Sequence, residues 1–132
     1  MNNIDKIVSF MESGQKTSQR IGLELEHFVC DRDYRVISYP EMAECLEEMS
    51  LLLQGRPVGE GGNVFGVLCD NFTLSLEPGC QLEISISPQD RIENIRKIYR
   101  RFKKAADHIL EKKGFYLLEK GVFPLIENGE LE

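Results

Sequence analysis

Three glutamates on two short alternating segments have the clearest capacity for chemistry. Glu24 and Glu26 lie two positions apart in RIGLELEHFVC, with one leucine between them and another just before the pair. Glu83 has the same setting in GCQLEISIS, between a leucine and an isoleucine. Alternate side chains of an extended strand project to opposite faces. If the apolar residues face a core, all three carboxylates project from the other side of their strands.

Carboxylates that share one space repel one another, because two unit charges roughly 4 Å apart interact by about 4 kcal/mol at an effective dielectric near 20. A divalent cation relieves this repulsion. Magnesium prefers hard oxygen ligands and usually keeps waters or substrate phosphates in its other positions. The alternative is that E-x-E is simply the solvent face of an antiparallel strand, which shows the same alternation. Spacing alone leaves both interpretations open.

The amino-terminal half of the chain contains the elements that would position Glu24 and Glu26. Apolar residues three and four apart predict an amphipathic helix over residues 3–13. A strand is expected over 20–30, followed by a turn and a short returning strand over 35–38. A second helix is expected to begin near Pro40, to pack on the apolar face of the sheet and to end before Gly55.

The elements around Glu83 follow in the second half of the chain. Turn signals separate apolar segments over residues 57–87 and predict an antiparallel meander. Asp90 followed by Glu93 is typical of a capping box, and an apolar stripe continues from there to Gly114. Residues 115–122 predict a last strand.

Together these elements predict an α+β fold. We expect an antiparallel sheet of about five to seven strands, with helices on one face and the acidic face open. A chain of 132 residues with 42% hydrophobic content can bury one core, so residues 1–132 are expected to form a single domain.

Composition narrows the functional classes. The formal net charge of −6 disfavours a nucleic-acid partner, because phosphate neutralisation requires an excess of Lys and Arg. No segment approaches the roughly 18 apolar residues of a membrane span, and we expect no membrane association. The four cysteines, Cys30, Cys45, Cys69 and Cys80, have no C-x-x-C spacing. They are read as reduced thiols of a cytoplasmic protein.

Two segments resemble the glutamate–cysteine ligase family. RIGLELEHF is similar to the opening G-x-E-x-E strand of these enzymes, and SLEPGCQLEISISP is similar to their S-L-E-P-G-G-Q-x-E-L-S segment. The intervening PVGEGGNVFGVL also fits the plant and proteobacterial branch, so the resemblance covers roughly residues 4–124. Cys80 departs from the pattern, which has a second glycine there, and predicts a turn with non-glycine backbone geometry.

The resemblance implies that Glu24, Glu26 and Glu83 are magnesium ligands. It implies that Glu77 is a further acidic residue in or beside the same metal site. Gln81 and Ser85 share the face of Glu83, and they are candidates to bind a cofactor or substrate or to orient the metal ligands. Ordinary strand hydrogen bonding is the alternative role for both. No catalytic residue is assigned, because the glutamates would hold metal rather than act as nucleophiles or bases.

The resemblance also implies a reaction and a fold. The γ-carboxylate of glutamate would attack the γ-phosphate of ATP, and the amine of cysteine would then displace phosphate from the acyl phosphate to give γ-glutamylcysteine. Mg²⁺ would neutralise charge on the phosphates. Glutamate, cysteine and ATP are thus the expected partners of the full-length enzyme, within a glutamine synthetase-like carboxylate–amine ligase fold.

Family members are several times longer than this chain. The chain is therefore expected to be the amino-terminal portion of a longer catalytic domain, inactive by itself, with residues 131–132 compatible with an expression-vector remnant. Exposed strand edges would then favour a homo-oligomer. Two alternatives stay open: a natural short metal-binding or nucleotide-binding module or partner subunit, and a related ligase with a different amine acceptor.

Overall fold

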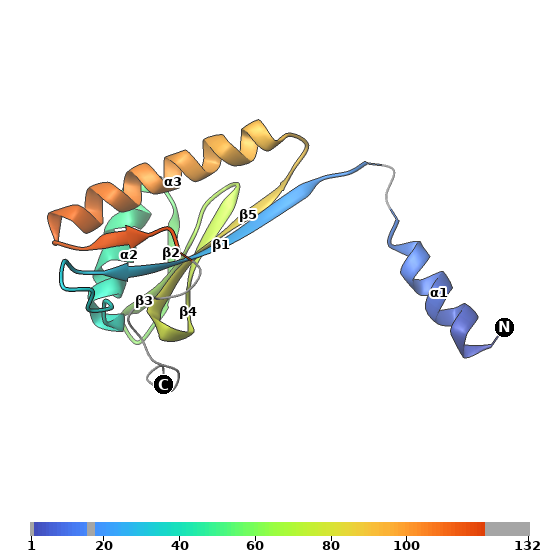
Figure 1. Ribbon diagram of the computed structural model, residues 1–132, viewed down its shortest axis with the longest axis horizontal. Coiled ribbons are helices and arrows are strands. Elements are labelled where there is room, and N and C mark those ends of the chain that lie inside the picture. Colours follow the sequence, from blue (N-terminus) through green and yellow to red (C-terminus); the bar gives the residue numbers. More distant parts are fainter. Residues whose placement is uncertain (1, 16–17, 121–132) are drawn as a thin grey trace.

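The computed structural model describes residues 2–15 and 18–120. Its three helices and six strands form an α+β arrangement (Figure 1). In chain order they are α1 (Asn3–Ser13), β1 (Ile21–Cys30), α2 (Tyr39–Leu53), β2 (Arg56–Glu60), β3 (Asn63–Leu68), β4 (Phe72–Glu77), a 3-10 turn (Pro78–Cys80), β5 (Gln81–Gln89), α3 (Ile92–Lys112) and β6 (Tyr116–Leu118).

The six strands form one antiparallel sheet in the order β2-β3-β4-β5-β1-β6. Strands β2 to β5 are joined by short turns, which confirms the predicted meander. β1 lies between β5 and β6, but β6 pairs only with its last three residues, Phe28, Val29 and Cys30. The other edge of β1 therefore has no strand partner from Ile21 to His27 among the described residues.

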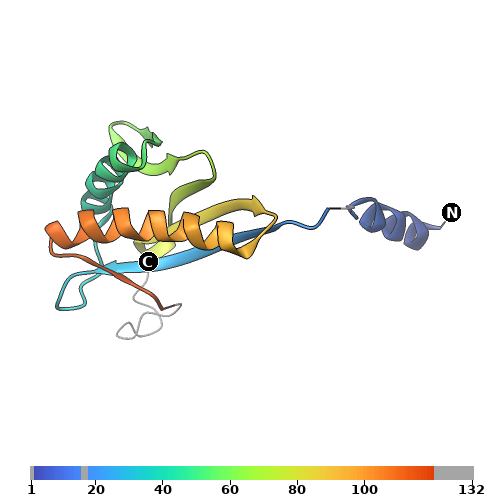
Figure 2. The same ribbon diagram turned by 90° about the horizontal axis from the view of Figure 1, so that it is seen from above.

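A single main core lies between one face of the sheet and helices α2 and α3. The alternating leucines and isoleucines of β5, such as Leu82 and Ile84, are fully buried against Phe102 of α3 and Met49 of α2. Both helices lie on the same side of the sheet (Figure 2). The expected helix-covered apolar face is confirmed. None of the described helices is long and apolar enough to cross a membrane.

Helix α1 lies apart from this core. It begins at an Asn2 cap, where the Asn2 side chain accepts a hydrogen bond from the Asp5 amide at 2.8 Å. The Asp5 carboxylate accepts one from the Asn2 amide at 3.2 Å. None of its residues is buried. Figure 1 shows the helix projecting away from the sheet, beyond the start of β1. The predicted helix is therefore correct, but its apolar stripe does not contact the core.

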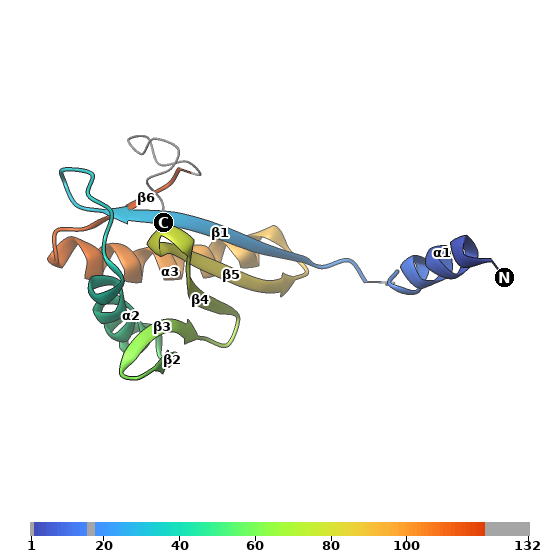
Figure 3. The same ribbon diagram turned by 90° about the horizontal axis from the view of Figure 1, so that it is seen from below.

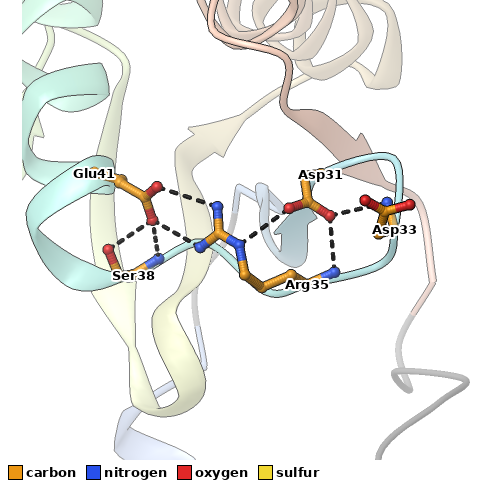
Figure 4. A network of polar contacts seen from close by, with 5 residues as sticks. All are labelled: Asp31, Asp33, Arg35, Ser38 and Glu41. Atoms are coloured by element: carbon orange, nitrogen blue, oxygen red, sulfur yellow. Dashed lines mark hydrogen bonds and ion pairs between the residues drawn. The ribbon is translucent and has the colours of Figure 1, made fainter.

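The turn between β1 and α2 is held by one arginine. Arg35 donates to Asp31 at 3.0 Å and makes a two-pronged contact with Glu41 at 3.0 and 3.1 Å (Figure 4). Glu41 also accepts from the Ser38 amide and hydroxyl, at 2.9 and 2.6 Å. The predicted strand over 35–38 is wrong: only a Cys30–Val36 bridge forms, because the chain is already turning into α2.

The ends of α3 and the last strand also differ from expectation. α3 begins after Arg91, and Asp90 forms an ion pair with Arg20 at 2.9 Å instead of a capping box. The last strand is confirmed only as Tyr116–Leu118, and the predicted residues 121–122 lie outside the described part of the chain.

Two turn positions have a backbone that their residue types did not indicate. Gln54, not Gly55, takes the left-handed conformation that ends α2, with φ of 56°. Gly55 is needed for space, since a Cβ there would lie 2.5 Å from Cγ1 of Val67. Cys80 has φ of 57°, so the turn keeps a glycine-like backbone despite its side chain, and our expectation there was wrong.

Candidate functional site

The antiparallel register places the predicted carboxylates side by side. Glu26 of β1 lies directly opposite Glu83 of β5, and Glu24 lies opposite Ser85. These residues alternate with the core-facing Leu25 and Ile84, so they occupy the face of the sheet turned away from α2 and α3. In Figure 3 the strands are seen in front of α3. Glu24, Glu26 and Glu83 are thus brought together on one surface.

Serine hydroxyls connect two of these carboxylates. The Ser85 hydroxyl lies 2.9 Å from Oε1 of Glu83 and 3.4 Å from Oε1 of Glu24. A hydroxyl carries one proton and donates to one carboxylate at a time, so the shorter contact to Glu83 is the stronger. Ser75 of β4, opposite Glu83, also donates to its Oε1 at 3.3 Å. From its position on β5, Ser85 can therefore orient both Glu24 and Glu83.

The other two predicted site residues lie further along the same strands. Glu77 of β4 and Gln81 of β5 are a register pair, two positions beyond the pair of Ser75 and Glu83. Glu77 is on the acidic face at the end of its strand. Gln81 donates its side-chain amide to the Pro78 carbonyl at 3.3 Å, which is a bond within the turn. Among the described residues, neither side chain forms a hydrogen bond with Glu24, Glu26 or Glu83, whereas the Ser85 hydroxyl contacts two of these carboxylates.

A hollow of about 590 Å³ lies at the open edge of β1. Its lining contains four carboxylates, one amine, two rings and an aliphatic side chain: Glu24, Glu26, Glu83, Glu119, Lys120, His27, Tyr99 and Leu25. Glu119 and Lys120 follow β6 and reach the hollow because β6 pairs with β1. Sequence reasoning missed them, and no local motif marked them, because their position depends on that pairing.

His27 forms the inner wall of the hollow. Its side chain is buried, with Nδ1 at 3.2 Å from the Leu82 carbonyl and Nε2 at 3.0 Å from the Tyr99 hydroxyl. A carbonyl can only accept, so Nδ1 carries the proton and Nε2 accepts from Tyr99. Burial lowers the pKa of His27, which keeps the ring neutral near pH 7. His27 is therefore a buried residue whose two ring nitrogens both have hydrogen-bond partners.

The acidic face carries oxygen atoms that suit magnesium, but its described residues are not arranged as a complete coordination site. Like charges directly opposite in an antiparallel pair destabilise it, and Glu26 faces Glu83 in this way. Carboxylate and hydroxyl oxygens are hard ligands that suit Mg²⁺. Within residues 2–15 and 18–120, however, no three His, Cys, Asp or Glu side chains are close enough to hold a metal as they stand. Metal binding would require the carboxylates to move together.

Comparison with known proteins finds similar sequences among plant enzymes. Over 91 residues the chain is 32% identical to a chloroplastic glutamate–cysteine ligase of Nicotiana tabacum, and 31% identical to the chloroplastic glutamate–cysteine ligase of Arabidopsis thaliana. The chloroplastic glutamate–cysteine ligase of Brassica juncea is 30% identical over the same length. Each match covers 67% of this chain.

The chain is a partial relative of the glutamate–cysteine ligases. The resemblance found in its two glutamate-bearing segments is thereby confirmed at the level of the family. The match spans only 17–18% of the length of these glutamate–cysteine ligases. No family model matches the chain.

Proposed function

We propose that this chain carries the acidic metal-holding strands of an ATP- and Mg²⁺-dependent ligase that joins the γ-carboxylate of glutamate to the amine of cysteine. Glu24, Glu26 and Glu83 would hold the metal, and Ser85 would orient them. Glu77 and Gln81, further along the sheet, would contact the metal or the nucleotide. The complete enzyme would have the glutamine synthetase-like carboxylate–amine ligase fold.

One observation carries this proposal: carboxylates of two strands far apart in the sequence occupy adjacent register positions on the face without helices. On a purely solvent-facing strand, nothing would favour Glu26 opposite Glu83, since the pair is mutually repulsive. The Ser85 hydroxyl offsets only part of the repulsion among these carboxylates, because it donates its single proton to one carboxylate at a time. A bound cation would offset the remaining repulsion.

Bound Mg²⁺ would neutralise charge on the ATP phosphates. The residues of this chain would hold the cation and orient its ligands. Glu24, Glu26 and Glu83 offer carboxylate oxygens to the cation, while the Ser85 hydroxyl restricts the orientation of two of them. The buried, neutral His27 supports the Tyr99 side of the hollow and is assigned no proton transfer.

A metal titration of the 132-residue chain tests the proposal. We expect saturable Mn²⁺ binding, detected by electron paramagnetic resonance and displaced by Mg²⁺. Glu83→Gln and Glu24→Gln each remove a charged ligand and should weaken binding about 10-fold or more. Glu93→Gln, on the exposed start of α3, loses the same charge and should leave affinity unchanged. Absence of saturable binding, or equal affinities in all variants, contradicts the assignment.

The remaining features of the complete enzyme are proposals of the same kind. We propose that the 132 residues alone have no ligase activity, since the match covers 17–18% of the ligases it resembles. Cysteine is proposed as the amine acceptor because the matched relatives are named glutamate–cysteine ligases.

A cytoplasmic location is proposed from the four free cysteines, whereas the matched plant ligases are named chloroplastic. A homo-oligomer through strand edges stays a prediction.

A further inference from the structure

Helix α1 presents an apolar stripe that no other described residue of its own chain covers. Its members lie three and four residues apart, and their side chains are between 48% and 71% exposed: Ile4, Ile7, Val8 and Met11. The helix has a formed amino-terminal cap but only 11 residues. A helix of this length is marginal in water unless its apolar face is packed. α1 therefore needs a receiving surface.

A groove of matching character lies on the outside of the fold, between the end of α2 and the second half of α3. Two adjoining hollows of about 580 and 390 Å³ share Leu52 and His108. The lining includes Leu51 and Leu52, which are 77% and 53% exposed. A groove with exposed leucines is the surface on which an amphipathic helix lays its apolar face.

The charges at the edges of the two surfaces are complementary. On α1, Asp5 and Glu12 follow Ile4 and Met11 and flank the stripe on one side. The groove is lined by three permanent cations, Arg101, Lys104 and Lys112, against two carboxylates, Glu48 and Glu111. Glu48 is already paired with Lys113 at 3.0 Å. The groove edge therefore has an excess of positive charge for the acidic side of α1.

We propose that α1 of one molecule binds in the α2–α3 groove of a second copy, and that two copies exchange their helices reciprocally. Figure 1 shows α1 directed away from its own sheet and helices. Its stripe residues are exposed among the described residues, so the stripe is available to another molecule. The exchange covers both exposed apolar surfaces of each copy. This inference is independent of the proposed metal site, which lies on the opposite face of the sheet.

Sedimentation analysis of the full chain over a range of concentrations measures the association. We expect a monomer–dimer equilibrium. Val8→Asp on the stripe and Leu52→Asp in the groove each place a charge in the contact, and each should weaken dimerisation about 10-fold or more. Ser9→Asp adds the same charge to the polar side of α1 and should leave the dissociation constant within about 2-fold. Circular dichroism verifies that each variant is folded.

Mixing the two defective variants distinguishes exchange from docking within one chain. The Leu52→Asp molecule keeps an intact helix α1, and the Val8→Asp molecule keeps an intact groove. One complete contact can therefore form between the two variants, so the mixture should form heterodimers more readily than either variant forms homodimers. A parent chain that stays monomeric, dimers insensitive to both substitutions, or a mixture that behaves as the separate variants would overturn the proposal.

Discussion

Arg35 connects three parts of the chain through a single side chain. Its guanidinium bonds to Asp31 after β1 and to Glu41 in the first turn of α2, and it lies 5.8 Å from the ring centre of Phe115. The hydrogen bonds from Arg35 and Ser38 lower the pKa of Glu41 from 4.5 to about 2. The carboxylate is thus bound more favourably in the folded chain than in the unfolded one.

This contact predicts an acid-dependent loss of stability. Because the folded pKa of Glu41 is depressed, its contribution is complete above about pH 4.5 and disappears as the pH falls through about 2. Glu41→Gln should lower the free energy of unfolding by about 1 kcal/mol at pH 7, since the contact is partly exposed. The variant should also lose part of the decline between pH 4.5 and 2.

Urea unfolding of both proteins across this pH range measures the effect. Glu47→Gln, on the same helix, is the matched control and should keep the decline of the parent chain. If the difference in unfolding free energy between Glu41→Gln and the parent were the same at every pH, Glu41 would not be the titrating group.

At the scale of elements, the join between α2 and the meander depends on close packing. Gly55 lies where a Cβ would be 2.5 Å from Cγ1 of Val67, 2.8 Å from Sγ of Cys69 and 3.0 Å from the Leu68 carbonyl. The segment that leaves α2 therefore passes β3 at a distance that admits no side chain at this residue. The same helix end is held by Arg101, which donates to the Leu53 carbonyl at 2.6 Å.

Gly55→Ala should destabilise the fold by about 1–3 kcal/mol, because the added methyl group must displace buried neighbours. Thermal and urea unfolding measure the loss. Val67→Ala removes the nearest atom, so the penalty of Gly55→Ala should be smaller in the double variant than in the parent background. Equal penalties in both backgrounds would show that contact with Val67 is not the cause.

At the scale of the whole molecule, stability is divided unevenly between the core and α1. β5 lies between β4 and β1 and presents fully buried residues to α2 and α3, whereas α1 buries none. Amide exchange should therefore be slow in β5 and fast in α1 at concentrations where the chain is monomeric.

Hydrogen exchange followed by mass spectrometry or NMR tests this division. Protection of α1 should increase with protein concentration if a second copy receives it, while protection of β5 should not change. Amides of α1 that are as protected as those of β5 in dilute solution would contradict the exposed position of this helix.

Much of the local structure could be predicted from residue patterns. The period-two alternation around Glu24 and Glu83 correctly assigned which side chains face the core, because it follows from the geometry of an extended backbone. The helices followed from apolar residues three and four apart, and the meander from turn residues between apolar segments. The short strand over 35–38 was not, because Arg35 and Glu41 turn the chain into α2 through side-chain bonds that no periodicity records.

Residue patterns were enough to assign the two carboxylate-bearing strands, their acidic sides and the resemblance to a ligase family, since all of these are properties of contiguous residues. Tertiary packing set three further features. The Ser85 hydroxyl contacts both Glu24 and Glu83. Glu119 lines the same hollow as these two glutamates, and α1 lies outside the core. Ser85 and Glu24 are 61 positions apart, and strand order and register set their distance. Register depends on how distant segments pair, which their separate patterns do not specify.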